Sequence, residues 1–282
     1  MLFEVVFGLA MTIGVYNIIT ALTALAREKE AARNTRQQLA AALPEMLVYT
    51  GSKLHLKGAR IAHILQQHFP YYQSLEPRLQ LQFRKRVQRF INHKTFIIRH
   101  YEGYTEMPVL ISAAAVQITF GLETYLLPWF TYIQVYPEGY FAENSFRVLA
   151  GHVKDKTITV AWNHFLHGLQ ESDGSNLGLH EMAHALYFQQ LVADTNRQQP
   201  FRLIYENVMR HGQETLKQND TRNTTLYSAY AFTNLQEFWA ESLEIFFEKP
   251  VAMEQHYPEL YQQLCQLLRQ NPDNKSNPIK LS

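Results

Sequence analysis

The chain has 282 residues, of which 46% are hydrophobic, so it can bury one sizeable core or two modest ones. Its formal net charge is +1, and this balance gives no reason to expect a nucleic-acid partner. The single cysteine, Cys265, excludes an internal disulfide and a thiolate-rich metal site, and it fits a reducing compartment.

The first 26 residues are apolar, and Glu4 is the only charged residue between Leu2 and Ala26. At 1.5 Å per residue, a helix of this length could cross a hydrocarbon core of about 30 Å. We therefore expect residues 1–26 to form an uncleaved transmembrane anchor. A signal peptide ending near Ala26 and a buried packing helix are the alternatives, although a positive n-region is missing.

Basic residues follow this apolar segment at Arg27, Lys29, Arg33 and Arg36. The positive-inside tendency then predicts a single-pass membrane protein whose main domain lies in the cytoplasm. Residues 27–43 are charged and Ala-rich, which predicts a helical juxtamembrane connector that ends at Pro44.

The main domain is expected over residues 44–272, with a mostly helical part up to about His93. Beyond it, strands are predicted at Thr95–Ile98 and Tyr132–Tyr136, flanking a helix from Pro108 to Phe120, and a third strand at Thr157–Trp162. Strands and long helices without regular alternation predict an α+β fold. We expect the third strand to form a sheet edge where an extended peptide could add. Residues 273–282 are expected to be a disordered tail.

The most informative stretch is His180-Glu181-Met182-Ala183-His184, which spells H-E-x-x-H. A turn-prone segment at 173–176 precedes it and offers N-cap oxygens, so the motif is predicted on a helix. Two histidines four residues apart lie on one helix face and can bind one metal ion, with Glu181 beside it as a general base. Two histidines satisfied in an ordinary core are the alternative, but burying them with a carboxylate costs several kcal/mol unless a charge compensates.

A catalytic zinc site usually has a third protein ligand. The metzincin pattern is excluded, because Gln190 stands where its third histidine would be and Tyr187 where its glycine would be. A second helix carries acidic residues at three- and four-residue steps, which are Glu237, Glu241, Glu244 and Glu248. The residues alone leave Glu237 and Glu241 open as ligand, and Glu237 could equally be the capping-box partner of Asn234.

The segments Leu179–Leu186 and Tyr230–Pro250 resemble those of the Mlc titration factor A family of bacterial zinc peptidases. The spelling from Tyr230 to Glu241 is also similar to that of the anthrax lethal factor catalytic domain. The resemblance runs from about Leu43 to Pro272 and does not cover the expected anchor. It implies a zincin-like domain that binds Zn²⁺ through His180, His184 and Glu237.

The resemblance further implies that Tyr230 is an active-site residue and that Glu241 is an outer carboxylate orienting a ligating histidine. On this basis Glu181 is expected to assist the attack of water on a peptide bond, with Tyr230 donating a hydrogen bond to the oxyanion.

The resemblance also implies that the substrate is a short peptide, cleaved from its amino end. The alternative function is a regulatory protein in which the zincin scaffold binds a transcriptional repressor. Gly151, His152, Tyr227 and Tyr230 are candidates to line the specificity pocket, whereas His164 and His167 are expected at the surface rather than as ligands.

Overall fold

The computed structural model describes residues 18–27, 30, 47–99, 106–141, 148–171, 173–193, 199–218 and 226–273. The chain divides into two compact units, residues 1–46 and 47–282. In the first unit, residues 18–27 are helical and exposed.

None of the described helices combines the length and the apolar character that crossing a bilayer requires. This finding overturns the expectation of a single-pass membrane protein, and with it the cytoplasmic placement that depended on the anchor. Residues 1–17 of the expected anchor lie outside the described residues, as do most of the connector at 27–43 and residues 274–282 of the expected tail.

The second unit is built on a five-stranded sheet with the order β1-β2-β3-β7-β6. The strands are β1 (Leu47–Thr50), β2 (Thr95–Ile98), β3 (Tyr132–Tyr136), β6 (Gly151–Lys154) and β7 (Thr157–Ala161). The central pairs β2–β3 and β3–β7 are parallel, and the outer pairs β1–β2 and β6–β7 are antiparallel. A separate hairpin pairs β4 (Tyr140–Phe141) with β5 (Val148–Leu149).

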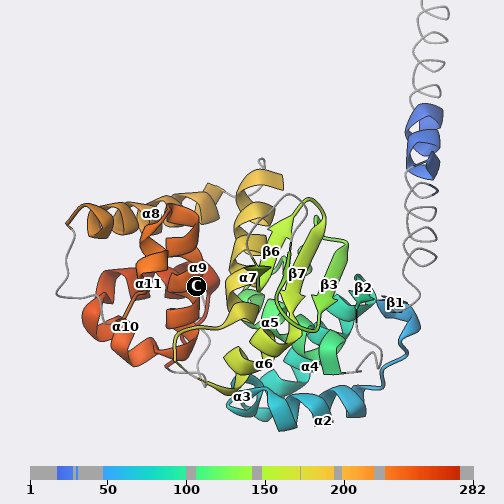
Figure 1. The fold of residues 1–282 in the computed structure, drawn as a ribbon, viewed down its shortest axis with the longest axis horizontal. Helices are drawn as coiled ribbons and strands as arrows, with labels where there is room; N and C mark the ends of the chain where they lie inside the picture. Colours follow the sequence, from blue (N-terminus) through green and yellow to red (C-terminus); the bar gives the residue numbers. More distant parts are fainter. Residues whose placement is uncertain are drawn as a thin grey trace, which may run out of the picture. The chain divides into compact units, whose positions relative to one another are not determined.

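Helices cover the sheet and extend beyond it (Figure 1). They are α2 (Gly58–His68), α3 (Pro70–Gln73), α4 (Pro77–Asn92), α5 (Glu106–Thr119), α6 (Trp162–Gln170), α7 (Leu177–Tyr187), α8 (Gln199–Gln218), α9 (Leu235–Glu248), α10 (Pro250–His256) and α11 (Pro258–Leu268). Short turns are η1 (Gly51–Lys53), the π-helical η2 (Phe188–Ala193) and the 3₁₀ turn η3 (Ala229–Phe232).

Helix α7 is the centre of this arrangement. It packs against β6 and β7 on one side and against α9 on the other, and α5 also contacts it. Figure 1 shows α7 between the sheet and the group formed by α8 to α11. Helix α5 is buried along its whole length from Met107 to Thr119 and supports α7 from within the core. A mostly apolar α7 is therefore held on several sides, which fixes the side chains it presents.

The α+β prediction is confirmed, and the strands expected at Thr95 and Tyr132 have the expected bounds. Two details differ. Strand β1 occupies the start of the part predicted to be helical, because its backbone pairs with β2. Strand β7 is not the sheet edge, since β6 turns back beside it and pairs with it from Gly151 to Lys154. The outer strand on that side is therefore β6.

Candidate metal centre

Helix α7 presents the two motif histidines toward each other. Asn176 caps the helix, and its side-chain oxygen accepts a hydrogen bond from the backbone N–H of Leu179 at 3.0 Å. The four-residue spacing brings the Nε2 atoms of His180 and His184 to 3.1 Å from each other. The two imidazole side chains are 17% and 19% exposed, so they are partly accessible rather than fully buried in the core.

Helix α9 brings Glu237 to the same point. The side chain of Asn234 accepts hydrogen bonds from the backbone N–H groups of Gln236 and Glu237, which sets the start of the helix. The Oε2 atom of Glu237 lies 3.1 Å from His180 Nε2 and 3.4 Å from His184 Nε2. Capping of α9 and contact with the histidines are thus compatible, since the Asn234 bonds involve only the Glu237 backbone. His180, His184 and Glu237 form a group that could hold a metal ion.

A tryptophan fixes the distance between the two helices. The indole N–H of Trp239 donates a 2.8 Å hydrogen bond to the backbone carbonyl of Ala183, which lies between the two motif histidines. Trp239 is fully buried. Because Trp239 follows Glu237 by two residues, this bond ties the carboxylate-bearing turn of α9 directly to the histidine-bearing turn of α7.

Two of the three converging side chains, His180 and Glu237, have shifted pKa values. Burial alone would lower the pKa of His180, but its hydrogen bonds to Glu237 and Glu244 outweigh that effect and raise it to about 10. Burial alone would raise the pKa of Glu237, but hydrogen bonds from His180 and His184 bring it well below its usual range. A proton on the imidazole therefore supplies the positive charge that this group of side chains requires.

Glu181 lies beside this group on the opposite side of α7 from α9. Its side chain is buried, its Oε2 atom has no hydrogen-bond partner, and burial raises its pKa to about 8. Strand β6 covers it at Gly151, where a Cβ atom would lie only 2.5 Å from Glu181 Oε1. Glycine at this position lets the edge strand lie directly on the carboxylate. A buried carboxylate oxygen without a partner, next to a cationic group, is a typical feature of a functional site.

The outer carboxylate that contacts a motif histidine is Glu244, not Glu241 as expected. Glu244 Oε1 accepts from His180 Nδ1 at 2.7 Å, and its other oxygen accepts from the backbone N–H of Asn176. Glu241 instead accepts hydrogen bonds from the backbone N–H and the hydroxyl of Ser228. Both carboxylates share the α9 stripe of Glu237, but only Glu244, two turns on, reaches the far nitrogen of the imidazole.

A fourth carboxylate on α9, Glu248, extends this support toward the start of α7. It accepts hydrogen bonds from the side-chain amide of Asn176 at 2.8 Å and from the backbone N–H of Gly174 at 2.9 Å. Glu244 and Glu248 together hold the N-cap of α7 from two directions. Helix α9 therefore positions His180 in two ways. It holds the residues that begin α7, and it bonds directly to the His180 ring.

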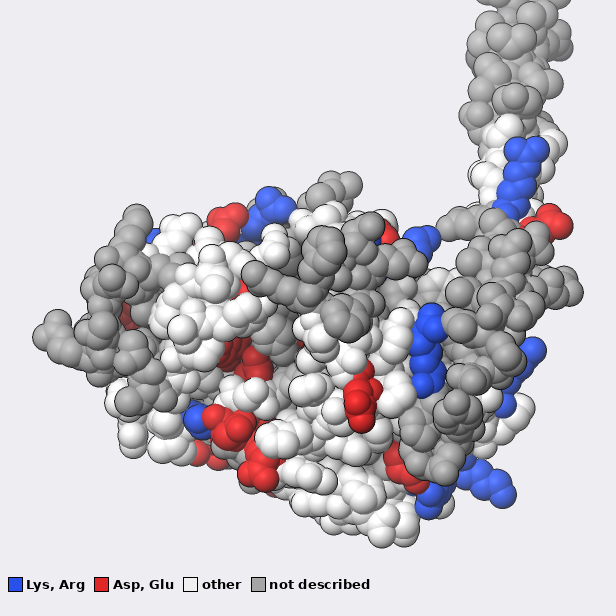
Figure 2. All heavy atoms as spheres, viewed as in Figure 1, with Lys and Arg blue, Asp and Glu red and all other residues white. Residues whose placement is uncertain are grey.

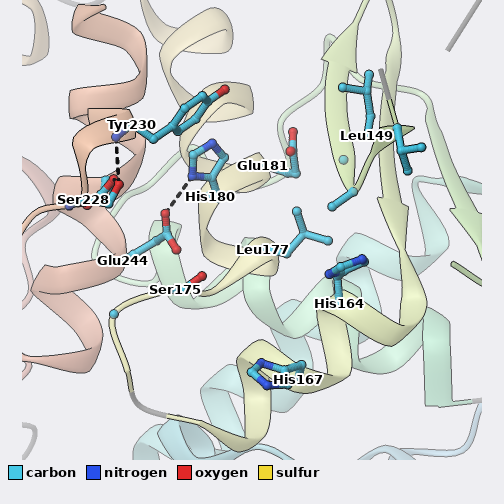
Figure 3. A pocket seen from close by; sticks show the side chains of 15 residues that line it. Leu149, His164, His167, Ser175, Leu177, His180, Glu181, Ser228, Tyr230 and Glu244 are labelled. Carbon is cyan, nitrogen blue, oxygen red and sulfur yellow. Dashed lines mark hydrogen bonds and ion pairs between the residues drawn. The ribbon is translucent and has the colours of Figure 1, made fainter. Parts of the chain in front are cut away.

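A pocket of about 470 Å³ opens beside His180 and Glu181. Figure 3 shows Tyr230 and Ser228 on one side, Leu149 on the other, and His164 and His167 of α6 at the far end. Its lining residues are Val148, Leu149, Ala150, Gly151, His164, His167, Gly174, Ser175, Leu177, His180, Glu181, Ser228, Tyr230, Glu241 and Glu244.

The sequence-predicted pocket residues divide into two groups. Gly151 and Tyr230 line the pocket, and the Tyr230 ring lies 6.4 Å from that of His180, centroid to centroid. His152 bonds instead to the hydroxyl of Tyr140, and Tyr227 is buried with its hydroxyl 2.9 Å from that of Ser242. His164 and His167, which no local pattern connects with the motif, also line the pocket. Their exposed positions on α6, which leads into the loop before α7, bring them there.

The charges around the cleft are mainly negative. In the view of Figure 2, acidic side chains are visible set back in the region where Figure 1 labels α7 and α9, while most described Lys and Arg side chains lie toward the rim of the domain. Carboxylates of Glu237, Glu241, Glu244 and Glu248 all come from α9. This excess of negative charge favours a cation in the cleft.

A helix carrying H-E-x-x-H that is joined by a glutamate from a second helix is the kind of site that metallopeptidases of the gluzincin type use. The family model described as glucose-regulated metallo-peptidase M90 matches residues 56–269, and the chain belongs to this family, which is the Mlc titration factor A family indicated by its motifs. It is also similar to an uncharacterized protein of Synechocystis sp., with 27% identity over 220 residues covering 71% of this chain and 80% of that protein.

Proposed function

We propose that this chain is a zinc-dependent peptidase that removes residues from the amino end of short peptides. The observation that carries this proposal is the convergence of His180, His184 and Glu237 next to a buried Glu181. Membership of a metallopeptidase family supports the same reaction class.

The donor set fits zinc. Zinc bonds to imidazole nitrogen and carboxylate oxygen at about 2.0–2.2 Å, so two ligands of a tetrahedral ion lie about 3.3 Å apart. The three donor atoms are separated by 3.1, 3.1 and 3.4 Å. Two imidazoles, one carboxylate and no thiolate are a ligand set typical of catalytic zinc. When bound, the ion would polarise the scissile carbonyl and lower the pKa of water.

Glu181 is proposed to move the proton in this reaction. Its carboxylate is adjacent to the metal-binding group without belonging to it, and it has an oxygen free of hydrogen bonds. It would accept a proton from the water that attacks the peptide carbonyl carbon and deliver that proton to the nitrogen of the leaving amine. A divalent cation nearby would favour the ionised form that accepts the proton.

Tyr230 is proposed to stabilise the oxygen of the scissile carbonyl as negative charge develops on it. Its ring borders the pocket next to His180, and the residue is 56% exposed, so a substrate can contact it. A phenol O–H is a suitable donor for such an oxygen.

Cleavage from the amino end follows from the family resemblance and is supported by the charges of the pocket. Glu241 and Glu244 line it together with Tyr230, so a free α-ammonium group enters a region of negative charge. An N-acetylated peptide lacks that positive charge. The preferred substrate class is therefore an unblocked short peptide.

Hydrolysis of a peptide library tests the proposal. The zinc-loaded full chain should cleave unblocked peptides and leave their N-acetylated counterparts largely intact. Glu181→Gln should retain zinc and lose on the order of a hundredfold or more in kcat/KM. If the zinc-loaded chain cleaves no peptide but retains a bound protein partner, the alternative of a regulatory scaffold replaces this proposal.

A further inference from the structure

We infer that Glu241 positions Tyr230 by holding Ser228, and that it does not act on the metal. This inference uses the proposed role of Tyr230 and adds a residue to it. The contact expected between Glu241 and a motif histidine is made by Glu244, which leaves the function of a buried carboxylate on the same helix to be explained.

The contacts form a direct connection from α9 to the turn that carries Tyr230. Glu241 receives two hydrogen bonds from Ser228, one from the backbone N–H and one, at 2.8 Å, from the hydroxyl. The same hydroxyl accepts a 3.1 Å hydrogen bond from the backbone N–H of Tyr230 and thereby caps η3 (Figure 3). Because the hydroxyl donates its one proton to Glu241, its lone pairs face the Tyr230 N–H.

Core packing holds Tyr227, the residue before Ser228, whereas Tyr230 is largely exposed. Tyr227 is buried, stacks on Phe238 at 5.1 Å and contacts the Ser242 hydroxyl. Three residues later, Tyr230 is more than half exposed. The backbone of η3, which Ser228 caps, therefore contributes to its location over His180.

The far end of η3 is also held, but by residues of the turn itself. The hydroxyl and the backbone N–H of Thr233 both donate to the carbonyl of Tyr230, at 2.8 and 3.0 Å. These bonds keep the shape of the turn and do not tie it to α9. The Glu241–Ser228 pair ties the start of η3 to the helix bearing Glu237, next to the contacts that Tyr227 makes with the same helix.

A carboxylate is needed for this double contact. Its two oxygens accept from two different donors of Ser228. Glutamine offers one oxygen and one NH₂ group, so Glu241→Gln loses one acceptor with little change in volume. The expected result is a looser η3 turn in a folded protein, and Glu254→Gln, at an exposed position on α10, is the matched control.

A double-mutant cycle tests the route through Tyr230. Glu241→Gln should lower kcat about 10-fold with zinc affinity unchanged, and it should have little further effect in a Tyr230→Phe background. Ser228→Ala should act like Glu241→Gln, whereas Ser228→Thr, which keeps the hydroxyl, should retain most activity. Additive losses in the cycle, or a loss of zinc affinity in Glu241→Gln, would overturn the inference.

Amide hydrogen exchange on the full chain without added metal tests the same inference independently of catalysis. Glu241→Gln should speed exchange in the segment 227–233 and leave α7 unchanged, while Glu254→Gln should change neither. If the wild type cleaves no peptide, the proposed function fails, and exchange still decides whether Glu241 holds this turn. Unchanged exchange at 227–233 would overturn the positioning role.

Discussion

The Nδ1 atom of His180 lies 2.7 Å from Oε1 of Glu244, while its Nε2 atom faces Oε2 of Glu237 at 3.1 Å. The Glu244 carboxylate accepts a hydrogen bond, so it keeps a proton on Nδ1. The lone pair available for a metal is then on Nε2, which is the nitrogen that faces His184 and Glu237. This arrangement selects the imidazole tautomer that the proposed zinc site needs.

Glu244→Gln should therefore weaken zinc binding about 10- to 100-fold, as the loss of such an outer carboxylate typically does. The amide has a single oxygen, which cannot serve both His180 Nδ1 and the Asn176 N–H. Competition with a chromophoric chelator measures the affinity, and Glu241→Gln is the matched variant on the same helix face. A larger loss of affinity in Glu241→Gln than in Glu244→Gln would contradict the assignment.

Gly151→Ala should lower activity sharply while zinc remains bound. The added Cβ would lie 2.5 Å from Oε1 and 2.7 Å from Cδ of Glu181, so the carboxylate has to move away from its position. The metal-binding atoms belong to other side chains. Gly58→Ala is the control, because no atom lies within 4 Å of the Cβ it would add. Equal activity of the two variants at equal zinc content would show that strand β6 does not set the position of Glu181.

The affinity for zinc should rise with pH across the neutral range. The pKa of His180 is raised to about 10 and that of Glu181 to about 8, so near pH 7 both groups carry protons in the metal-free chain. Zinc must displace the His180 proton and favours ionised Glu181, and raising the pH removes these competitors. Each displaced proton adds up to about tenfold in affinity per pH unit. Calorimetric titrations at pH 6 and pH 8 measure the change, and equal affinities would contradict the predicted protonation states.

The motif helix and the ligand-bearing helix could be predicted from sequence because their signals are local. The H-E-x-x-H spacing, the Asn176 cap and the Asn234 cap each depend on residues only a few positions apart. The α+β class likewise follows from runs such as Thr95–Ile98 and Tyr132–Tyr136. Local patterns determine which residues share a helix face. The metal-binding group then forms once α7 and α9 pack together.

The roles of Glu241 and Glu244 could not be separated in this way. Both lie within one stripe of α9. Around an ideal helix, Glu241 is about 40° from Glu237 and Glu244 about 20°. Which of them meets His180 depends on how α9 sits against α7, which the bond from Trp239 to Ala183 fixes. The outer strand β6 could not be predicted from the sequence for a similar reason. It is a short, half-buried segment, and its pairing with β7 is a tertiary contact.

Zinc stoichiometry tests the central claim most directly. The full chain, reconstituted with zinc and dialysed, should contain about one zinc ion per chain by elemental analysis. Glu237→Ala should retain little, because it removes one of three ligands from a site that a catalytic zinc needs complete. A wild-type chain that retains no zinc, or a Glu237→Ala variant that retains as much as the wild type, would contradict the site described for His180, His184 and Glu237.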